Sequence, residues 1–209
     1  PMPHPSPVPV SQPVVTGVTS PYHRVLIVSP HFPPINAPDH QRVRTALPYL
    51  EEFGWEAEIL TVQPELVEHP QDPFLQRVLP DVPRTSTAAL PAPLTRKFGL
   101  GNLGLRCLPF LARAGDRLLA SRRFDLVFFS TTIFPVMVLG DRWRRRFAVP
   151  YILDFQDPWR VEAAPTRQRP GGRWRYALDK GLARLLEPHA LKQVSQVISV
   201  SPAYPGLLQ

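Results

Sequence analysis

Apolar residues along the chain fall into five short runs that predict β-strands. The runs cover residues 24–29, 55–62, 124–132, 149–155 and 196–201, and they are rich in valine, isoleucine, leucine and phenylalanine. The runs at 24–29 and 124–132 lack regular polar alternation, which is typical of strands that are buried on both faces of a sheet. The pattern therefore predicts the central strands of an α/β domain.

Between these runs, apolar residues recur at intervals of three and four, which predicts helices. The expected inward positions are Val43, Ala46, Leu47, Leu50 and Phe53 in the first helix, Leu105, Leu108, Leu111, Ala112, Leu118 and Leu119 in the second, and Tyr176, Leu178, Leu182, Leu185 and Leu186 in a helix over 173–192. A further helix precedes the arginines at 142 and 144–146, whose cations suit the negative end of a helix dipole.

Capping residues and prolines set the expected helix boundaries. Asp39 is the predicted N-cap of the first helix, and Gly54 is its expected stop. We expect Pro48 to kink this helix and Pro109 to interrupt the second one, because proline lacks a backbone donor. Pro135 fits the first turn of the helix that follows the third strand.

Strands that alternate with helices predict a Rossmann-like α/β fold, with a parallel sheet and helices on both faces. Residues 1–21 are proline-rich and predict a disordered or polyproline II-like leader, which leaves 22–209 as one domain. Residues 63–104 show little periodicity and predict a long excursion. GLGNLG at 99–104 matches a dinucleotide fingerprint, but no buried strand precedes it, so we interpret it as a loop and helix start.

Composition narrows the functional classes. The chain of 209 residues has a formal net charge of +7, and only Lys97, Lys180 and Lys192 are lysines. Excess arginine suits phosphate, nucleic acid or an anionic membrane face, and an arginine-rich genome explains it equally well. The arginines are dispersed or lie at helix ends, which disfavours a nucleic-acid partner.

The lone Cys107 excludes an intramolecular disulfide and disfavours a cysteine-based metal site, and a cytoplasmic setting fits. No apolar run reaches the ~18 residues of a membrane span. No His, Cys and Asp set has metal-ligand spacing, and no Walker loop or nucleophile elbow appears. We therefore expect neither a metal nor a bound cofactor.

In parallel sheets, ligands bind beyond the carboxyl ends of the strands, so the residues there are the candidates. After the first strand come His31, Asn36, Asp39 and Arg42, near a helix start that offers free N–H groups for an anion. Ordinary loop polarity with outward arginines is the alternative.

The third and fourth strands add hydroxyls, carboxylates and an aromatic side chain. Ser130 and Thr131 can touch a ligand, or Thr131 and its neighbour Thr132 can cap the next helix. Asp154 lies within an apolar strand and must be paired or hydrogen-bonded, which favours a structural role. Asp157 lies one step further out, where a polar substrate can reach it, and Trp159 displays an aromatic face or packs on the domain.

Several of these segments, in this order, resemble the N-terminal domain of family 4-type glycosyltransferases of the GT-B fold, and are most similar to bacterial members of exopolysaccharide or envelope polysaccharide type. They are HFPPINAPDHQRVRTALPYLEEFGWEAEILTV (31–62), FDLVFFSTT (124–132), VPYILDFQDPWR (149–160) and QVISVSPAY (196–204). The resemblance covers roughly residues 24–209, with 63–104 poorly constrained. Many relatives carry a glycine in the first loop, where this chain has Asn36-Ala37-Pro38-Asp39.

The resemblance implies an acceptor-binding half of a retaining hexosyltransferase-type enzyme that needs no metal. A C-terminal domain, absent here, would hold the nucleotide-sugar donor, so the chain reads as a fragment that is inactive alone. It implies Asp157 as the catalytic residue that orients the acceptor, Arg42 for diphosphate charge, and His31, Asn36 and Asp39 in the first loop. The expected acceptor is a glycan or is lipid-linked.

Two alternatives remain open. The chain can be a non-catalytic Rossmann-like module for an anionic ligand or a protein partner, which a stop codon directly after Gln209 would favour. The arginine cluster at 142–146, with Trp143, can contact the inner face of a membrane peripherally, or it can serve only the helix dipole.

Overall fold

The computed structural model describes residues 22–96, 101–160 and 172–200. The strands are β1 His23–Val28, β2 Trp55–Val62, β3 Arg84–Thr87, β4 Leu126–Ser130, β5 Tyr151–Phe155 and β6 Gln196–Ser199. The α-helices are α1 Gln41–Ala46, α2 Phe74–Arg77, α3 Ala92–Arg96, α4 Leu103–Ser121, α5 Leu139–Phe147 and α6 Gly172–Leu191. Short 3-10 turns are η1 Pro38–His40, η2 Leu47–Tyr49, η3 Glu51–Phe53, η4 Pro64–Leu66 and η5 Phe134–Val138.

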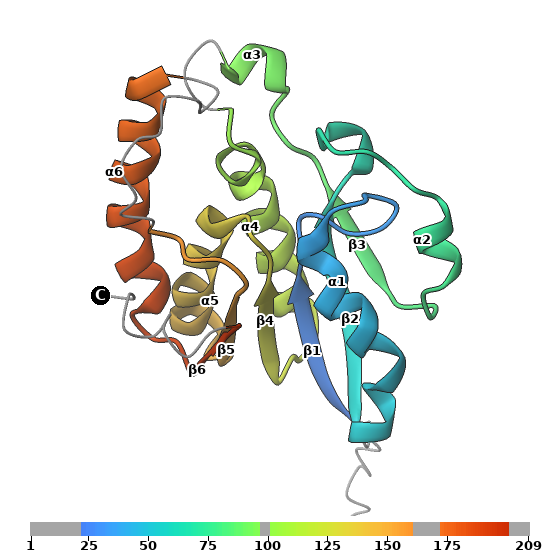
Figure 1. Ribbon diagram of the computed structural model, residues 1–209. Helices are drawn as coiled ribbons and strands as arrows, with labels where there is room; N and C mark the ends of the chain where they lie inside the picture. The colour runs from blue at the N-terminus through green and yellow to red at the C-terminus, as the bar shows by residue number, and fades with distance from the viewer. Residues whose placement is uncertain (1–21, 97–100, 161–171, 201–209) are drawn as a thin grey trace, which may run out of the picture.

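The strands form one parallel sheet in the order β3-β2-β1-β4-β5-β6. Figure 1 shows α1 crossing one face of this sheet, with α4 and α5 on the other. The predicted Rossmann-like α/β fold is thereby confirmed. The predictions for the leader at 1–21, for Gly99 and Leu100 and for Ser201 concern residues outside the described ranges.

The central strand β1 is buried on both sides, as its apolar run predicted. Leu26 and Val28 belong to the large core under α4 and α5. Val25 and Ile27 belong to a smaller core under α1. Because successive side chains of a strand point to opposite faces, a strand between two helix layers needs apolar residues at every position.

The excursion at 63–104 contains a strand that the sequence pattern missed. Residues 84–87 (Arg-Thr-Ser-Thr) form β3 and pair with β2 at the edge of the sheet. Of these four side chains, Thr87 alone is buried, so the strand carries no apolar run. The end of the excursion is the predicted helix start, since the side chain of Asn102 accepts a hydrogen bond from the Gly104 amide at 2.8 Å and caps α4.

The two helix prolines have different effects. The α-helix after β1 ends at Ala46 and continues as 3-10 turns from Leu47 onwards, which agrees with the break expected at Pro48. The predicted interruption at Pro109 is wrong, because α4 runs through it from Leu103 to Ser121. Pro109 is exposed, so the carbonyl that loses its partner can be solvated by water.

Some predicted inward positions of the first helix are also wrong. Val43 and Leu47 are buried in the smaller core. Phe53, by contrast, is 75% exposed, and Ala46 is exposed as well. The change to 3-10 geometry alters the rotation per residue, so positions counted at 3.6 per turn no longer share one face.

The inward face of α6 differs from the one expected. Leu178 and Leu185 are 41% and 60% exposed, which overturns their prediction as inward positions. The buried side chains of α6 are Ala183, Glu187 and Ala190 instead. Leu182 and Leu186, which were also predicted, are half-buried, so the leucine spacing agrees with the inward side of α6 at these two positions. The side chain of Tyr176, another predicted position, is not among those described.

Candidate functional site at the carboxyl ends of β1, β4 and β5

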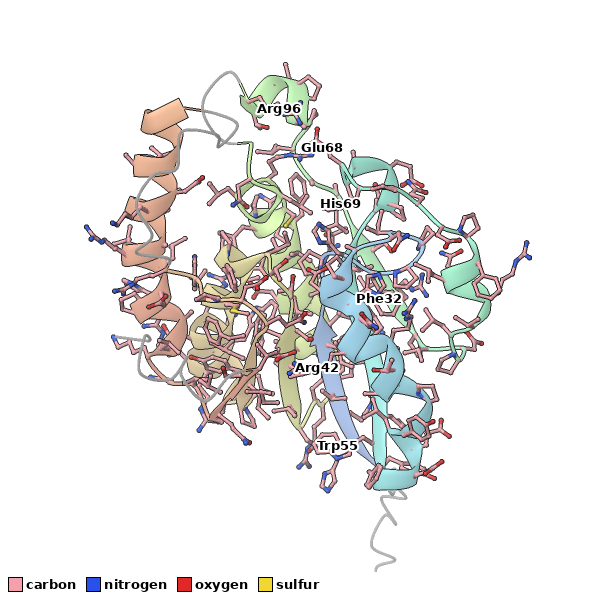
Figure 2. All side chains as sticks on the ribbon, viewed as in Figure 1. Phe32, Arg42, Trp55, Glu68, His69 and Arg96 are labelled. Carbon is pink, nitrogen blue, oxygen red and sulfur yellow. The ribbon has the colours of Figure 1, made fainter. Side chains whose placement is uncertain are left out.

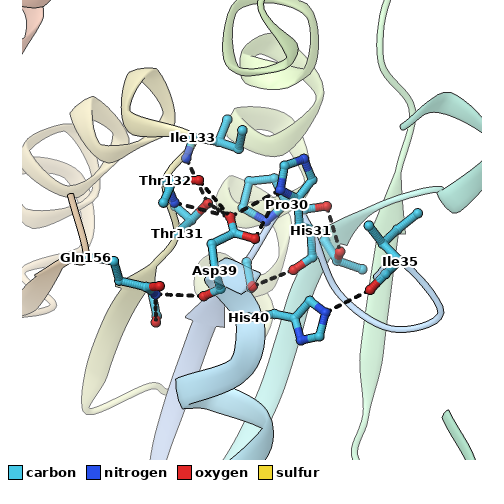
Figure 3. Close-up of polar contacts among 12 residues, drawn as sticks. Pro30, His31, Ile35, Asp39, His40, Thr131, Thr132, Ile133 and Gln156 are labelled. Carbon is cyan, nitrogen blue, oxygen red and sulfur yellow. Dashed lines mark hydrogen bonds and ion pairs between the residues drawn. The ribbon is translucent and has the colours of Figure 1, made fainter. Parts of the chain in front are cut away.

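Three neighbouring parallel strands bring their carboxyl ends to one edge of the sheet. β1 pairs with β4, and β4 pairs with β5, so the loops that follow these strands meet. Figure 3 shows polar side chains from the three loops turned toward one another. We call this group the strand-end network, and its members are His31, Asp39, Arg42, Ser130, Thr131, Thr132, Asp154 and Gln156.

Asp39 lies at the centre of the network and is 1% exposed. Its carboxylate accepts hydrogen bonds from Thr131 Oγ1 at 3.0 Å, from the Thr132 amide at 3.2 Å and from Thr132 Oγ1 at 3.3 Å. The Nδ1 atom of His31 lies 3.1 Å from both carboxylate oxygens. This carboxylate therefore ties the loop after β1 to the loop after β4.

Burial alone would raise the pKa of Asp39, because the charged form loses its water. The donors outweigh this effect: the hydrogen bonds of His31, the Thr132 amide and the Thr131 hydroxyl hold the pKa of Asp39 below its ordinary value. Asp39 therefore favours its anionic form, which the donors of its own chain stabilise.

The predicted N-cap role of Asp39 is wrong. Ala37 and His40 occupy the N-cap positions of η1 and α1, and neither helix start has a side-chain cap. Asp39 points to β4 instead, because that loop offers it more donors than the short helix start does. Thr131 acts locally as well, since its hydroxyl oxygen accepts a hydrogen bond from the Ile133 amide at 3.0 Å.

Asp154, at the end of β5, anchors the second half of the network. It is fully buried, it accepts a hydrogen bond from Ser130 Oγ at 2.8 Å, and it forms an ion pair with Arg42 Nη1. Burial raises the pKa of Asp154, against the lowering effects of Ser130, Arg42 and Gln156. The side-chain amide of Gln156 donates to the Asp39 carbonyl at 2.6 Å and thus joins the two halves.

His31 is held from two sides. Its carbonyl accepts a hydrogen bond from Ser29 Oγ at 2.8 Å, and its Nδ1 faces Asp39. The edge of its ring meets His69 at a centroid distance of 4.7 Å. Figure 2 places His69 beyond the carboxyl end of β1 and Arg42 on α1. A proton on Nδ1, shared with the carboxylate, leaves Nε2 as a hydrogen-bond acceptor.

Three predicted residues lie outside the network. Asn36 is exposed, and its amide N–H donates to the Pro70 carbonyl at 2.8 Å. Asp157 is exposed at the rim. Trp159 is half-buried and stacks on Phe134 at 5.4 Å. The predicted residues that the fold brings together are His31, Asp39, Arg42, Ser130, Thr131 and Asp154.

Gln156 was not among the predicted site residues, although it lies between Asp154 and Asp157 in the sequence. Sequence reasoning also gave no role to His40, which is 1% exposed. The Nε2 atom of His40 donates to the Ile35 carbonyl at 2.7 Å and fixes the loop after β1. Burial lowers the pKa of His40, so its ring is neutral near pH 7.

The arginine cluster of α5 has internal partners. Arg142 and Arg146 each lie 2.6 Å from Asp116 Oδ2 on α4, and Arg145 lies 2.6 Å from Asp141. The two pairs with Asp116 join α4 to α5, whereas the Arg145–Asp141 pair lies within α5. Within the described ranges no group of three His, Cys, Asp or Glu side chains could hold a metal ion. The same ranges contain no helix that is both long and apolar enough to span a bilayer.

Comparisons with known proteins agree with this architecture. A family model described as a glycosyl transferase 4-like domain matches residues 39–208. Among solved structures, apo UGT2 of Phytolacca americana is similar, with a TM-score of 0.53 and 11% sequence identity. The likeness covers 88% of this chain and 47% of that chain, so this chain spans about half of its length. No curated protein matches in sequence.

Proposed function

The chain belongs to the glycosyl transferase 4-like domain family, and from this premise we propose that it is the acceptor-binding half of a retaining, hexosyltransferase-type glycosyltransferase. The sugar moves from a nucleotide-sugar donor to a glycan or lipid-linked acceptor, as in enzymes that build bacterial polysaccharides. A second domain holds most of the donor, no metal takes part, and the reaction takes place in the cytoplasm or at the inner face of the membrane.

The observation that carries this proposal is the His31–Asp39 pair at the carboxyl ends of β1 and β4. Asp39 is buried and fixes the ring of His31 through Nδ1. His31 is 5% exposed, and with the proton of the neutral ring on Nδ1 its Nε2 is the ring atom left to accept a hydrogen bond from a sugar hydroxyl, at the edge of the sheet where ligands of such folds bind. Orientation of the acceptor hydroxyl is a large part of what a transferase must supply.

Two further residues take roles in this proposal. Asp157, exposed at the rim, orients the acceptor from the β5 side. Arg42 keeps 38% of its side chain exposed while it pairs with Asp154, so part of its guanidinium can face the leaving diphosphate. A preorganised cation lowers the barrier for departure of such a group.

The test is a transfer assay on the product of the longest reading frame that contains this chain. Release of nucleoside diphosphate from a panel of nucleotide sugars is measured with and without candidate acceptors. We expect His31→Ala and Asp157→Ala each to lower kcat/KM at least ~100-fold, since misplaced acceptors commonly cost that much. The control is Arg77→Gln, at an exposed position on α2 that is not part of the strand-end network.

Unchanged kinetics in both variants would remove these residues from the site. A folded protein that binds nucleotide sugars without turning them over would overturn the enzymatic proposal and favour the non-catalytic binding module.

A further inference from the structure

A cavity of about 360 Å³ lies beside the strand-end network and is lined in part by Thr132, whose backbone amide is bound to Asp39. Its other walls come from α6, from η5, from the start of α4 and from the segment after β5. Its volume is within the ~300–1,000 Å³ that is usual for small-molecule sites. Because Thr132 belongs to both, a ligand in this cavity lies next to the proposed transfer point.

One wall of the cavity is a rigid aromatic stack. Trp159 stacks on Phe134 with an interplanar angle of 20°, and Phe134 stacks on Phe155 at 6.0 Å and 22°. Phe155 is fully buried, which anchors the stack in the core. Trp159 lines the cavity, and a large flat ring with an apolar face is suited to packing against the C–H face of a sugar.

The part of the lining that comes from α6 carries two cations. Lys180 and Arg184 stand one turn apart on α6, and neither has an ion-pair partner among the described residues. Two like charges at this spacing destabilise a helix, and an anion bound between them would offset that repulsion. Asp179 also lines the cavity. Arg160 is the third cation in the cavity lining.

Arg160 is backed by a fully buried carboxylate. Its Nε atom lies 3.0 Å from Glu187 Oε1, and the Glu187 oxygens accept no hydrogen bond within the described part of the chain. Burial raises the pKa of Glu187, and the charge of Arg160 opposes that rise. A buried glutamate whose oxygens accept no hydrogen bond is costly for stability. The ion pair with Arg160 gives Glu187 a role, which is to orient the guanidinium.

We propose that this cavity binds an anionic sugar, with the ring on Trp159 and the phosphate or carboxylate between Lys180, Arg184 and Arg160. The inference rests on the proposed function, because it names the acceptor class of that site. A sugar phosphate and a uronic acid share the required chemistry, and the experiment separates them.

The experiment measures binding to chain 1–209 by titration calorimetry at low salt. Four probes are used: glucose 1-phosphate, glucuronic acid, glucose and inorganic phosphate. We expect at least one of the two anionic sugars to bind ten times more tightly than both glucose and inorganic phosphate. Preference for glucose 1-phosphate identifies a sugar phosphate, and preference for glucuronic acid identifies a uronic acid.

Variants test the location. Lys180→Met combined with Arg184→Met should weaken binding of the anionic sugar at least tenfold, and Trp159→Leu should remove its advantage over inorganic phosphate. Lys192→Met is the matched control, since Lys192 follows the end of α6, is exposed and does not line the cavity. A variant effect equal to that of the control would overturn the proposal.

Two other outcomes would also overturn it. In one, neither anionic sugar binds; in the other, inorganic phosphate binds as tightly as the sugar. Transfer activity is measured separately on the longer protein. Transfer without anionic-sugar binding leaves the proposed function standing, and binding without transfer leaves the cavity assignment standing.

Discussion

A glycine in the middle of α4 sets how closely α4 approaches α5. A Cβ atom built on Gly115 would lie 2.1 Å from Cζ2 of Trp143, which is inside any permitted contact. Trp143 cannot yield easily, since it is fully buried, stacks on Phe129 at 5.8 Å and donates from Nε1 to Asp116 at 3.0 Å. We therefore expect Gly115→Ala to destabilise the domain.

The magnitude follows from two opposing effects. Replacement of glycine by alanine inside a helix stabilises by ~1 kcal/mol, whereas an extra methyl in a packed core costs ~1–3 kcal/mol. At 2.1 Å the cost lies at the upper end, which gives Gly115→Ala a net loss of about 2 kcal/mol. Gly181 of α6 is the matched control, because nothing lies within 4 Å of its added Cβ, and Gly181→Ala should gain about 0.5–1 kcal/mol.

The assay is chemical and thermal unfolding of both variants, followed by far-UV circular dichroism. The expected gap of ~3 kcal/mol corresponds to a difference in Tm of roughly 6–12 °C for a domain of this size. A second variant, Trp143→Phe, removes the ring atoms that clash. In this background Gly115→Ala should cause a smaller loss of stability. Equal stability of the two alanine variants would refute the packing of α4 on α5 described here.

Two more predictions concern buried titratable groups. The lowered pKa of Asp39 means that its contribution to stability is present above the unfolded value, near ~3.9, and is lost as the pH falls through the folded value. Asp39→Asn should thus lower the free energy of unfolding by about 2 kcal/mol at pH 7, as expected for charge-assisted hydrogen bonds, and by less below pH ~4. Denaturant titrations that show the same loss of stability at pH 3 and at pH 7 would contradict this. Burial raises the pKa of Cys107 to about 12, so the thiol should resist a disulfide reagent at pH 8 until the chain unfolds. Labelling of Cys107 in the native protein as fast as in denaturant would show that α4 does not cover it.

Much of the fold could be predicted from sequence because its strands are buried on both faces. The run at 126–129 (Leu-Val-Phe-Phe) is apolar at every position because its side chains pack against both cores, and this makes it visible without any structure. The rule that ligands lie beyond the carboxyl ends of parallel strands then selected loops whose polar side chains the fold brings into contact. The edge strand β3 escaped detection for the converse reason, because its exposed side chains have no need to be apolar.

The partners of the site residues could not be predicted in the same way. Asp39 and Thr131 are 92 residues apart, and their contact depends on the strand order of the finished sheet. A local interpretation of Asp39 as an N-cap was reasonable, since sequence shows only neighbours along the chain. The burial of Glu187 at the centre of the inward face of α6 was not predicted, because a charged side chain is not expected there. The ion pair with Arg160 explains this position, and Arg160 comes from the segment after β5.

The two buried aspartates of the network have opposite pKa shifts, and this separates their roles. Asp39 is buried and accepts hydrogen bonds from donors of its own chain, so the role proposed for it is to position His31 and not to contact a substrate. Asp154 has a raised pKa, so its anionic form depends on Arg42. A guanidinium offers five N–H donors and Asp154 is bound through Nη1, so Arg42 can remain paired and still present other donors to a diphosphate. Release of Arg42 from Asp154 would leave a buried, unpaired charge, which is the costlier arrangement. The ion pair therefore fixes the direction of Arg42 without preventing the role proposed for it.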